Sequence, residues 1–167
     1  MSATFDFLSV RKKNKDEENA FYRFNEKLEL ICRNLPFEIC NSLYDFLPDF
    51  SPRKRTFAVW CDEFFSEDND VINREVQVRY ILAQVDDIER TIKSMLDMLP
   101  VLYSNERVTK DYEKELTSLK QTCLRLKNNR NNYKVLAQIF TTQFKNTVEI
   151  LYPNLKEFYE KPYDAEE

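Results

Sequence analysis

Glycine and histidine are both absent from this chain of 167 residues. Without glycine it has no glycine-rich loop to cradle a phosphate, no tight dinucleotide-binding turn and no strained nucleophile elbow. Without histidine it lacks the commonest general base, pH switch and metal ligand. These two absences exclude most familiar enzyme chemistry, so we expect no cofactor and no bound metal.

Carboxylates do not fill that gap, because the acidic pairs are adjacent in the sequence, as in Asp86-Asp87 and Glu17-Glu18. Neighbouring side chains on a helix point about 100° apart and do not converge on one substrate. Di-metal sites in helical bundles use a Glu-x-x-His motif, which this chain cannot contain. The sequence therefore predicts a protein that is not an enzyme.

Cysteine is scarce, with four residues at positions 32, 40, 61 and 123 and no Cys-x-x-Cys spacing. These intervals suggest neither a disulfide framework nor a zinc site. We predict reduced thiols packed as small hydrophobic groups in an intracellular protein. No run approaches the roughly 18 apolar residues that span a bilayer, and the N-terminus lacks the pattern of a signal peptide. We therefore expect a cytoplasmic or nuclear location.

Aromatic and charged residues, by contrast, are abundant. The chain has 13 Phe and 9 Tyr, and 32% of its residues are charged. This aromatic content is heavy for a simple two-stranded coiled coil and predicts a broader packed core. The net charge of −4 provides no general basic surface for nucleic acid or anionic lipid.

The strongest periodic signal lies between residues 69 and 150. One apolar row alternates between spacings of three and four: Val78, Ile81, Val85, Ile88, Ile92, Met95 and Leu99. A second row follows Pro100 with the same spacing: Tyr112, Leu116, Leu119, Cys123, Leu126, Arg130, Tyr133, Ala137, Phe140 and Phe144. Two such rows with a short connection predict an elongated antiparallel helical hairpin.

Shorter aromatic-rich segments flank this hairpin. Helical spacing begins at Asp16, and Pro36 is expected to interrupt it and begin a second short helix. Residues 1–15 are predicted to be a flexible tail, and residues 153–167 a short helix with an acidic end. The predicted fold class is all-α: one helical domain over 16–167, in which short helices of 16–65 pack on the 69–150 hairpin or coiled coil.

Several residues are candidates for interaction. The predicted hairpin is too long for short helices to cover on both sides, so either one bundle buries the two rows or a partner completes them. Arg130, a charge in an apolar row, either specifies a partner or reaches solvent where the facing helix has ended. Phe5, Phe7 and Leu8 either fold back on the bundle or anchor in a groove of another protein.

A basic stretch also stands out, because no acidic residue occurs between Glu115 and Glu149. Its cations that could meet a phosphate surface are Lys120, Arg125, Lys127, Arg130 and Lys134. The antiparallel register brings an acidic segment containing Asp86 and Glu89 beside this stretch, so we expect the charges to pair internally.

Ser51 precedes Pro52 and the basic Arg53 and Lys54, which matches the pattern that proline-directed kinases recognise. A phosphate at this helix start beside cations would be well accommodated. The alternative is an ordinary N-cap serine with proline at the first helical position. Both interpretations stay open.

These features favour a non-enzymatic scaffold or adaptor subunit of an intracellular, eukaryotic multiprotein complex, acting through helical packing surfaces. Its partners would be other helical subunits or a second copy of the chain. One alternative is a membrane-associating dimer of the BAR type, and another is a nucleic-acid-associated protein that uses the basic 120–145 face. The acidic net charge argues against both alternatives.

Overall fold

The computed structural model describes residues 2–46, 56–66, 74–102 and 106–162. Within these ranges the chain is almost entirely helical and contains no strand, which confirms the all-α fold class. The elements are α1 (Ser2–Phe46), α2 (Phe57–Phe64), α3 (Arg74–Leu102), α4 (Glu106–Asn128), α5 (Tyr133–Ile139), the π-helix η1 (Phe140–Phe144), α6 (Lys145–Leu151), the 3₁₀ turn η2 (Pro153–Leu155) and α7 (Lys156–Glu160).

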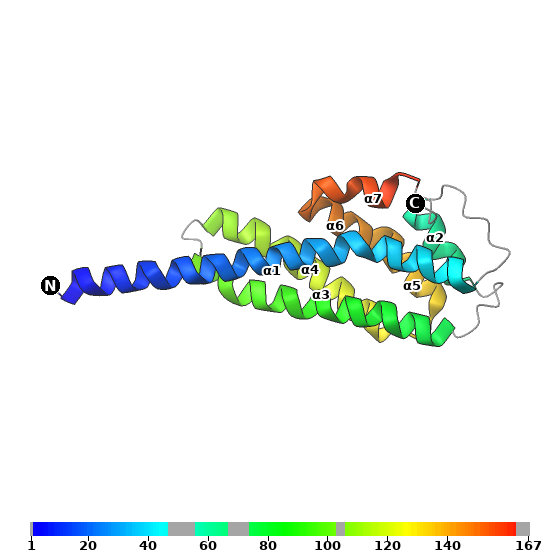
Figure 1. Ribbon diagram of the computed structural model, residues 1–167, viewed down its shortest axis with the longest axis horizontal. Coiled ribbons are helices and arrows are strands. Elements are labelled where there is room, and N and C mark those ends of the chain that lie inside the picture. The colour runs from blue at the N-terminus through cyan, green and yellow to red at the C-terminus, as the bar shows by residue number, and fades with distance from the viewer. Residues whose placement is uncertain (1, 47–55, 67–73, 103–105, 163–167) are drawn as a thin grey trace.

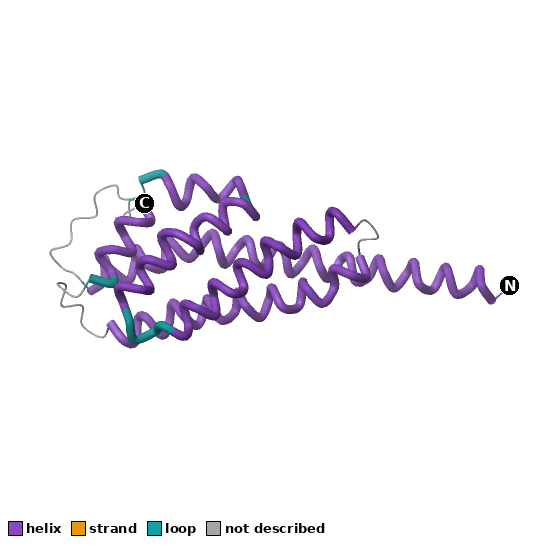
Figure 2. Tube along the Cα trace, turned by 180° about the vertical axis from the view of Figure 1, so that it is seen from behind, coloured by secondary structure: helices purple, strands orange, loops and turns teal. Residues whose placement is uncertain are grey.

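The long helices lie side by side in an elongated bundle (Figure 1). Helix α3 runs antiparallel to α1, and α4 reverses direction again beside α3 (Figures 1 and 2). The segment α5–η1–α6 then returns along α4, while α2 and α7 pack together at the side. Each reversal places an apolar face against a neighbouring helix, which is how amphipathic helices bury their stripes.

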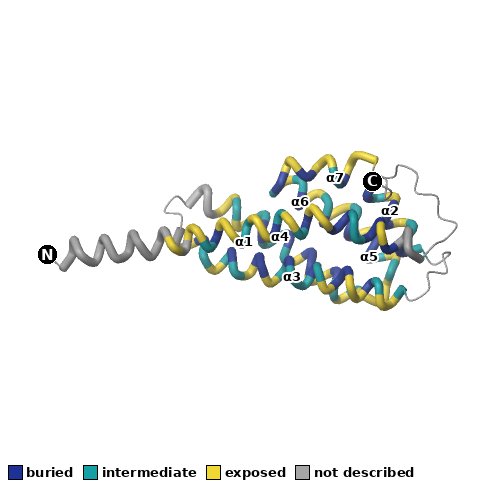
Figure 3. Tube along the Cα trace, viewed as in Figure 1, coloured by how far each residue is buried: buried dark blue, intermediate teal, exposed yellow. Residues whose placement is uncertain are grey.

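The two predicted apolar rows form the core. Every residue of the first row, from Val78 to Leu99, is buried on α3. On α4 the buried residues of the second row are Leu116, Leu119, Cys123 and Leu126. Buried residues recur along the described parts of the packed helices (Figure 3). The described helices thus bury the whole first row and most of the second, in which Tyr112 and Tyr133 are partly buried and Arg130 is exposed.

The prediction of one long second arm is wrong. Helix α4 ends at Asn128, and a new helix begins at Tyr133 and runs back along α4. The intervening Asn129, Arg130, Asn131 and Asn132 break the helix because asparagine side chains compete for backbone hydrogen bonds. Asn129 Nδ2 donates to the Arg125 carbonyl (2.7 Å), and Asn132 caps α5 by accepting from the Val135 N–H (3.3 Å).

Replacing Asn132 with alanine is expected to lower the free energy of unfolding by about 1 kcal/mol, because α5 loses its N-cap. Asn131→Ala is the matched control, since Asn131 is exposed in the same turn and does not cap α5. Urea denaturation of both variants measures the difference. Equal stability of the two variants would show that the cap does not hold the reversal.

The expected start of helix at Asp16 and the expected break at Pro36 are also wrong, because α1 is continuous from Ser2 to Phe46. No glycine or proline lies between Ser2 and Leu35 to end it. A proline inside a helix has no N–H for the carbonyl four residues earlier, which here belongs to Cys32. The buried Tyr159 hydroxyl donates to that carbonyl. Helix α7 therefore supplies the hydrogen bond that Pro36 removes.

The C-terminal segment lies along one stripe of α1. Asn25 Oδ1 accepts hydrogen bonds from the hydroxyls of Tyr152 (2.5 Å) and Tyr112 (2.9 Å). One turn later Glu29 accepts from the Asn154 amide (2.7 Å). Farther along α1, Phe37 meets Phe158 with ring centroids 5.7 Å apart, and Arg33 lies 5.1 Å from the same ring. The contacts of Tyr152, Asn154 and Phe158 join α1 to residues that lie more than 100 positions later in the sequence, and Tyr112 adds a contact from α4.

All four cysteines are free and buried, which confirms their predicted role as packed thiols. Burial raises the pKa of the Cys61 and Cys123 thiols well above the usual value. Protonated thiols in a dry core are poor nucleophiles. These cysteines are structural.

Candidate functional site

The most irregular part of the bundle is the π-helical turn η1, and a cleft opens on each side of it. Thr141 Oγ1 donates to the Ala137 carbonyl (2.9 Å), and Thr142 Oγ1 donates to the Gln138 carbonyl (2.6 Å). Such side-chain bonds satisfy carbonyls where the widened π turn shifts the backbone pattern. Single π turns of this kind occur often at functional sites, and the two clefts beside η1 are therefore the candidate sites.

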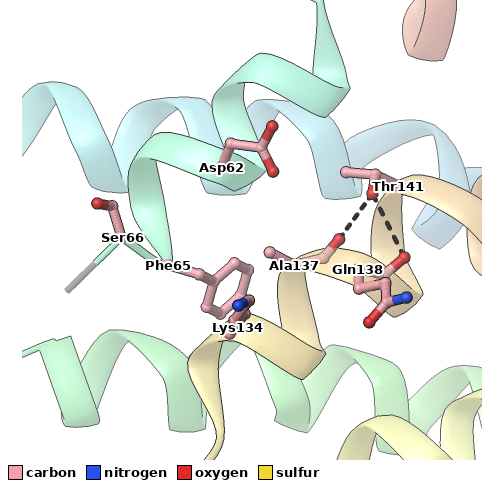
Figure 4. A pocket seen from close by; sticks show the side chains of 7 residues that line it. All are labelled: Asp62, Phe65, Ser66, Lys134, Ala137, Gln138 and Thr141. Atoms are coloured by element: carbon pink, nitrogen blue, oxygen red, sulfur yellow. Dashed lines mark hydrogen bonds between the residues drawn. The ribbon is translucent and has the colours of Figure 1, made fainter.

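The α2–α5 cleft has a volume of about 640 Å³ and lies between α2 and the start of η1 (Figure 4). Its lining residues are Asp62, Phe65, Ser66, Lys134, Ala137, Gln138 and Thr141. Asp62 on α2 and Lys134 on α5 bring opposite charges to its walls, and the buried Phe65 and Ala137 form an apolar floor. Burial and the neighbouring Glu63 raise the pKa of Asp62. The cleft therefore presents one acidic and one basic side chain beside an apolar surface.

The α4–α6 cleft, of about 400 Å³, lies between α4 and the η1–α6 segment. Ser118, Gln121, Thr122 and Arg125 line it from α4, and Gln143, Asn146 and Thr147 line it from the returning segment. Arg125 donates a hydrogen bond to Gln143 Oε1 across the cleft. Arg125 is the only charged group among these lining residues, so this cleft carries one positive charge.

The five predicted basic candidates do not share one face. Arg125 points to η1, whereas Lys127 reaches α3, where its ammonium pairs with Asp86 (2.7 Å) and with Glu89. Lys120 is partly exposed and lies two helical turns before Lys127. Arg130 is exposed in the turn after α4, and Lys134 lines the other cleft. The structure therefore places these five basic residues in different surroundings and forms no single basic face from them.

The ion pair between α3 and α4 confirms that acidic and basic segments face each other. The hydrogen bond from Lys127 lowers the pKa of Asp86, and the bonds to Asp86 and Glu89 raise the pKa of Lys127. A lowered carboxyl pKa contributes stability at neutral pH that is lost as the pH falls through that pKa. The raised pKa of Lys127 contributes stability that is lost as the pH rises through that pKa. The pair therefore stabilises the fold between those limits.

Lys127→Glu is expected to lower the free energy of unfolding by about 2 kcal/mol at neutral pH, because it places three carboxylates together at a partly buried position. Lys134→Glu is the matched control on an exposed residue and should change stability by less than about 0.5 kcal/mol. Chemical denaturation measures both variants. Adding Glu89→Lys should restore most of the loss; no restoration would contradict the pairing.

Other predicted residues fall outside the description. Ser51, with Arg53 and Lys54, lies outside the described residues. Phe5, Phe7 and Leu8 belong to the helix α1, but their side chains also lie outside the description. The structure therefore leaves these predictions as they were.

Sequence reasoning missed Asp62, Thr141, Gln143 and Asn146 as cleft residues. Nothing in the local pattern distinguishes Asp62 from other exposed acids. A signal did exist for Gln143 and Asn146, because both are polar residues inside the stretch that lacks acids. Only the reversal of the chain between Asn128 and Asn132 brings Gln143 and Asn146 opposite Arg125, and the sequence analysis did not predict this reversal.

Within the described ranges, no group of three or more Cys, Asp or Glu residues could hold a metal ion. No described helix is both long and apolar enough to cross a bilayer. Comparison of the chain with protein-family models, with curated proteins and with solved structures finds no match.

Proposed function

We propose that this protein is a non-enzymatic helical interaction subunit that binds a partner through the N-terminal arm of α1, residues 2–15. The observation that carries the proposal is the position of this arm. It projects beyond the ends of α3 and α4, and no described element lies beside it (Figures 1 and 2). A partner helix would give the arm the packing that the described bundle does not.

Physical chemistry supports a covered arm. An isolated helix shorter than about 12–15 residues is marginal in water, and helices in proteins are stabilised mainly by packing. The arm contains Phe5, Phe7 and Leu8, and apolar residues on an uncovered helix favour association. The described bundle already buries its own apolar rows, so the arm is the part that most needs a second chain.

The proposed setting is an intracellular multiprotein complex of helical subunits. The four cysteines are free, and free thiols are usual in proteins of a reducing compartment. This supports an intracellular setting. The BAR-type alternative gains no support, because the second arm of the expected hairpin folds back. The nucleic-acid alternative gains none either, because Lys127 and Lys145 are engaged with carboxylates.

The test compares complexes purified from the native cells with the tagged full-length chain, a chain lacking residues 2–15, and the double variant Phe5→Asp/Leu8→Asp. Ser9→Asp is the matched control within the arm. We expect a stoichiometric helical partner with the full-length and Ser9→Asp chains and its loss from the other two. Light scattering of the pure protein distinguishes a second copy. Retention of the same partner by the truncated chain would refute the proposal.

A further inference from the structure

We propose that the α4–α6 cleft binds a phosphate-type oxyanion, with the Arg125 guanidinium as its principal ligand. Its volume of about 400 Å³ is at the lower end of the range for small-molecule sites, which fits a small ligand. The site is distinct from the N-terminal arm, so this proposal does not depend on the proposed function.

No described residue neutralises the charge of Arg125. Lys127 and Lys145 each pair with two carboxylates, from Asp86 and Glu89 and from Glu149 and Glu160 respectively. Arg125 forms no ion pair with a described residue and instead donates to the neutral amide of Gln143. In a chain with more acidic than basic residues, this guanidinium faces a cleft whose lining contains no acid.

Neutral polar groups complete the site from both walls. Gln121 brings an amide from α4, and Asn146 and Thr147 bring an amide and a hydroxyl from α6. The Thr122 hydroxyl donates to the Ser118 carbonyl (2.9 Å), so it is already used. Amide and hydroxyl donors beside an arginine form the usual environment of a bound phosphate.

The local geometry positions the arginine. A guanidinium has five N–H donors in a planar fork, and the bond to Gln143 Oε1 uses one side of it. The remaining donors can bind two oxygens of a tetrahedral anion, which a lysine cannot do with the same geometry. Gln143 belongs to the π-helical turn, so the irregular turn η1 sets the position of this contact.

The test is an NMR titration of the full chain with inorganic phosphate and, separately, with O-phosphoserine, at constant ionic strength in chloride. Saturable shifts of the Arg125 and Thr147 signals are expected. Arg125→Gln should weaken binding by about tenfold or more, since hydrogen bonds to charged groups are strong. Arg130→Gln is the matched control, because Arg130 is exposed outside the cleft and the change in charge is the same.

A second pair of variants tests the acid-free lining. Asn146→Asp adds a carboxylate opposite Arg125 and should abolish saturable binding, whereas Asn131→Asp in the exposed turn should not. Tighter binding of O-phosphoserine than of inorganic phosphate would identify a phosphorylated side chain as the source; the reverse would identify the free ion. Shifts that do not saturate, or an equal loss in Arg125→Gln and Arg130→Gln, would overturn the proposal.

Discussion

Replacing Leu136 with alanine is expected to lower the free energy of unfolding by about 2–5 kcal/mol, the usual cost of removing a buried leucine side chain. Leu136 lies outside the apolar row that the sequence predicts, yet its side chain is 0% exposed. Leu136 is buried because the chain reverses after Asn128, so that α5 packs against both α2 and α4. The loss of stability in Leu136→Ala therefore tests whether the chain reverses after Asn128.

Leu30→Ala is the matched control, because Leu30 is 55% exposed on α1. Its stability should stay within about 0.5 kcal/mol of the parent. Urea denaturation, with the slope compared among the three proteins, gives both values. If Leu136→Ala were as mild as Leu30→Ala, residue 136 would be on a solvent-exposed face and the reversal would be wrong.

Tyr159→Phe is expected to lower the free energy of unfolding by about 1–3 kcal/mol, because it leaves the buried Cys32 carbonyl without its donor. The ring of Tyr159 packs 4.7 Å from that of Phe57, and phenylalanine keeps this contact. Burial raises the pKa of Tyr159 well above its usual value, so the hydroxyl keeps its proton and donates. The substitution thus isolates one hydrogen bond.

The substitution Pro36→Ala tests whether the loss of stability in Tyr159→Phe comes from the missing hydrogen bond to the Cys32 carbonyl. Alanine at position 36 restores an N–H that can donate to the Cys32 carbonyl, so Tyr159→Phe should cost markedly less in this background. Tyr22→Phe is the control for a phenol that is half exposed and should have little effect. An identical cost of Tyr159→Phe with and without Pro36 would show that the hydroxyl does not compensate for the proline.

Local spacing was enough to predict the core row of α3. Val78, Ile88 and Leu99 lie on one stripe because the helical period alone decides it, and all three are buried. The facing charges of Asp86 and Lys127 followed from the antiparallel register of two neighbouring helices. Both features follow from the helical period and from the pairing of helices that are adjacent in the sequence, so they can be predicted from the sequence.

The errors share a different origin. Pro36 is a helix breaker by every local rule, but its missing hydrogen bond is replaced from Tyr159, far away in the chain. Arg130 continued the three–four spacing, so the spacing concealed the turn in which it lies. The α4–α6 cleft exists only once α6 has returned to α4, and no local pattern can place Gln143 opposite Arg125.

The most direct test of the account is the distance between spin labels at Gln121 and Asn146, which are both exposed and line the same cleft. The native cysteines are buried, so a thiol label should reach only cysteines introduced at these two positions. We predict one short distance, because packed helices lie about 8–10 Å apart. A distribution centred near 38 Å, the length of a continuous helix at about 1.5 Å per residue, would contradict the reversal and the cleft that depends on it.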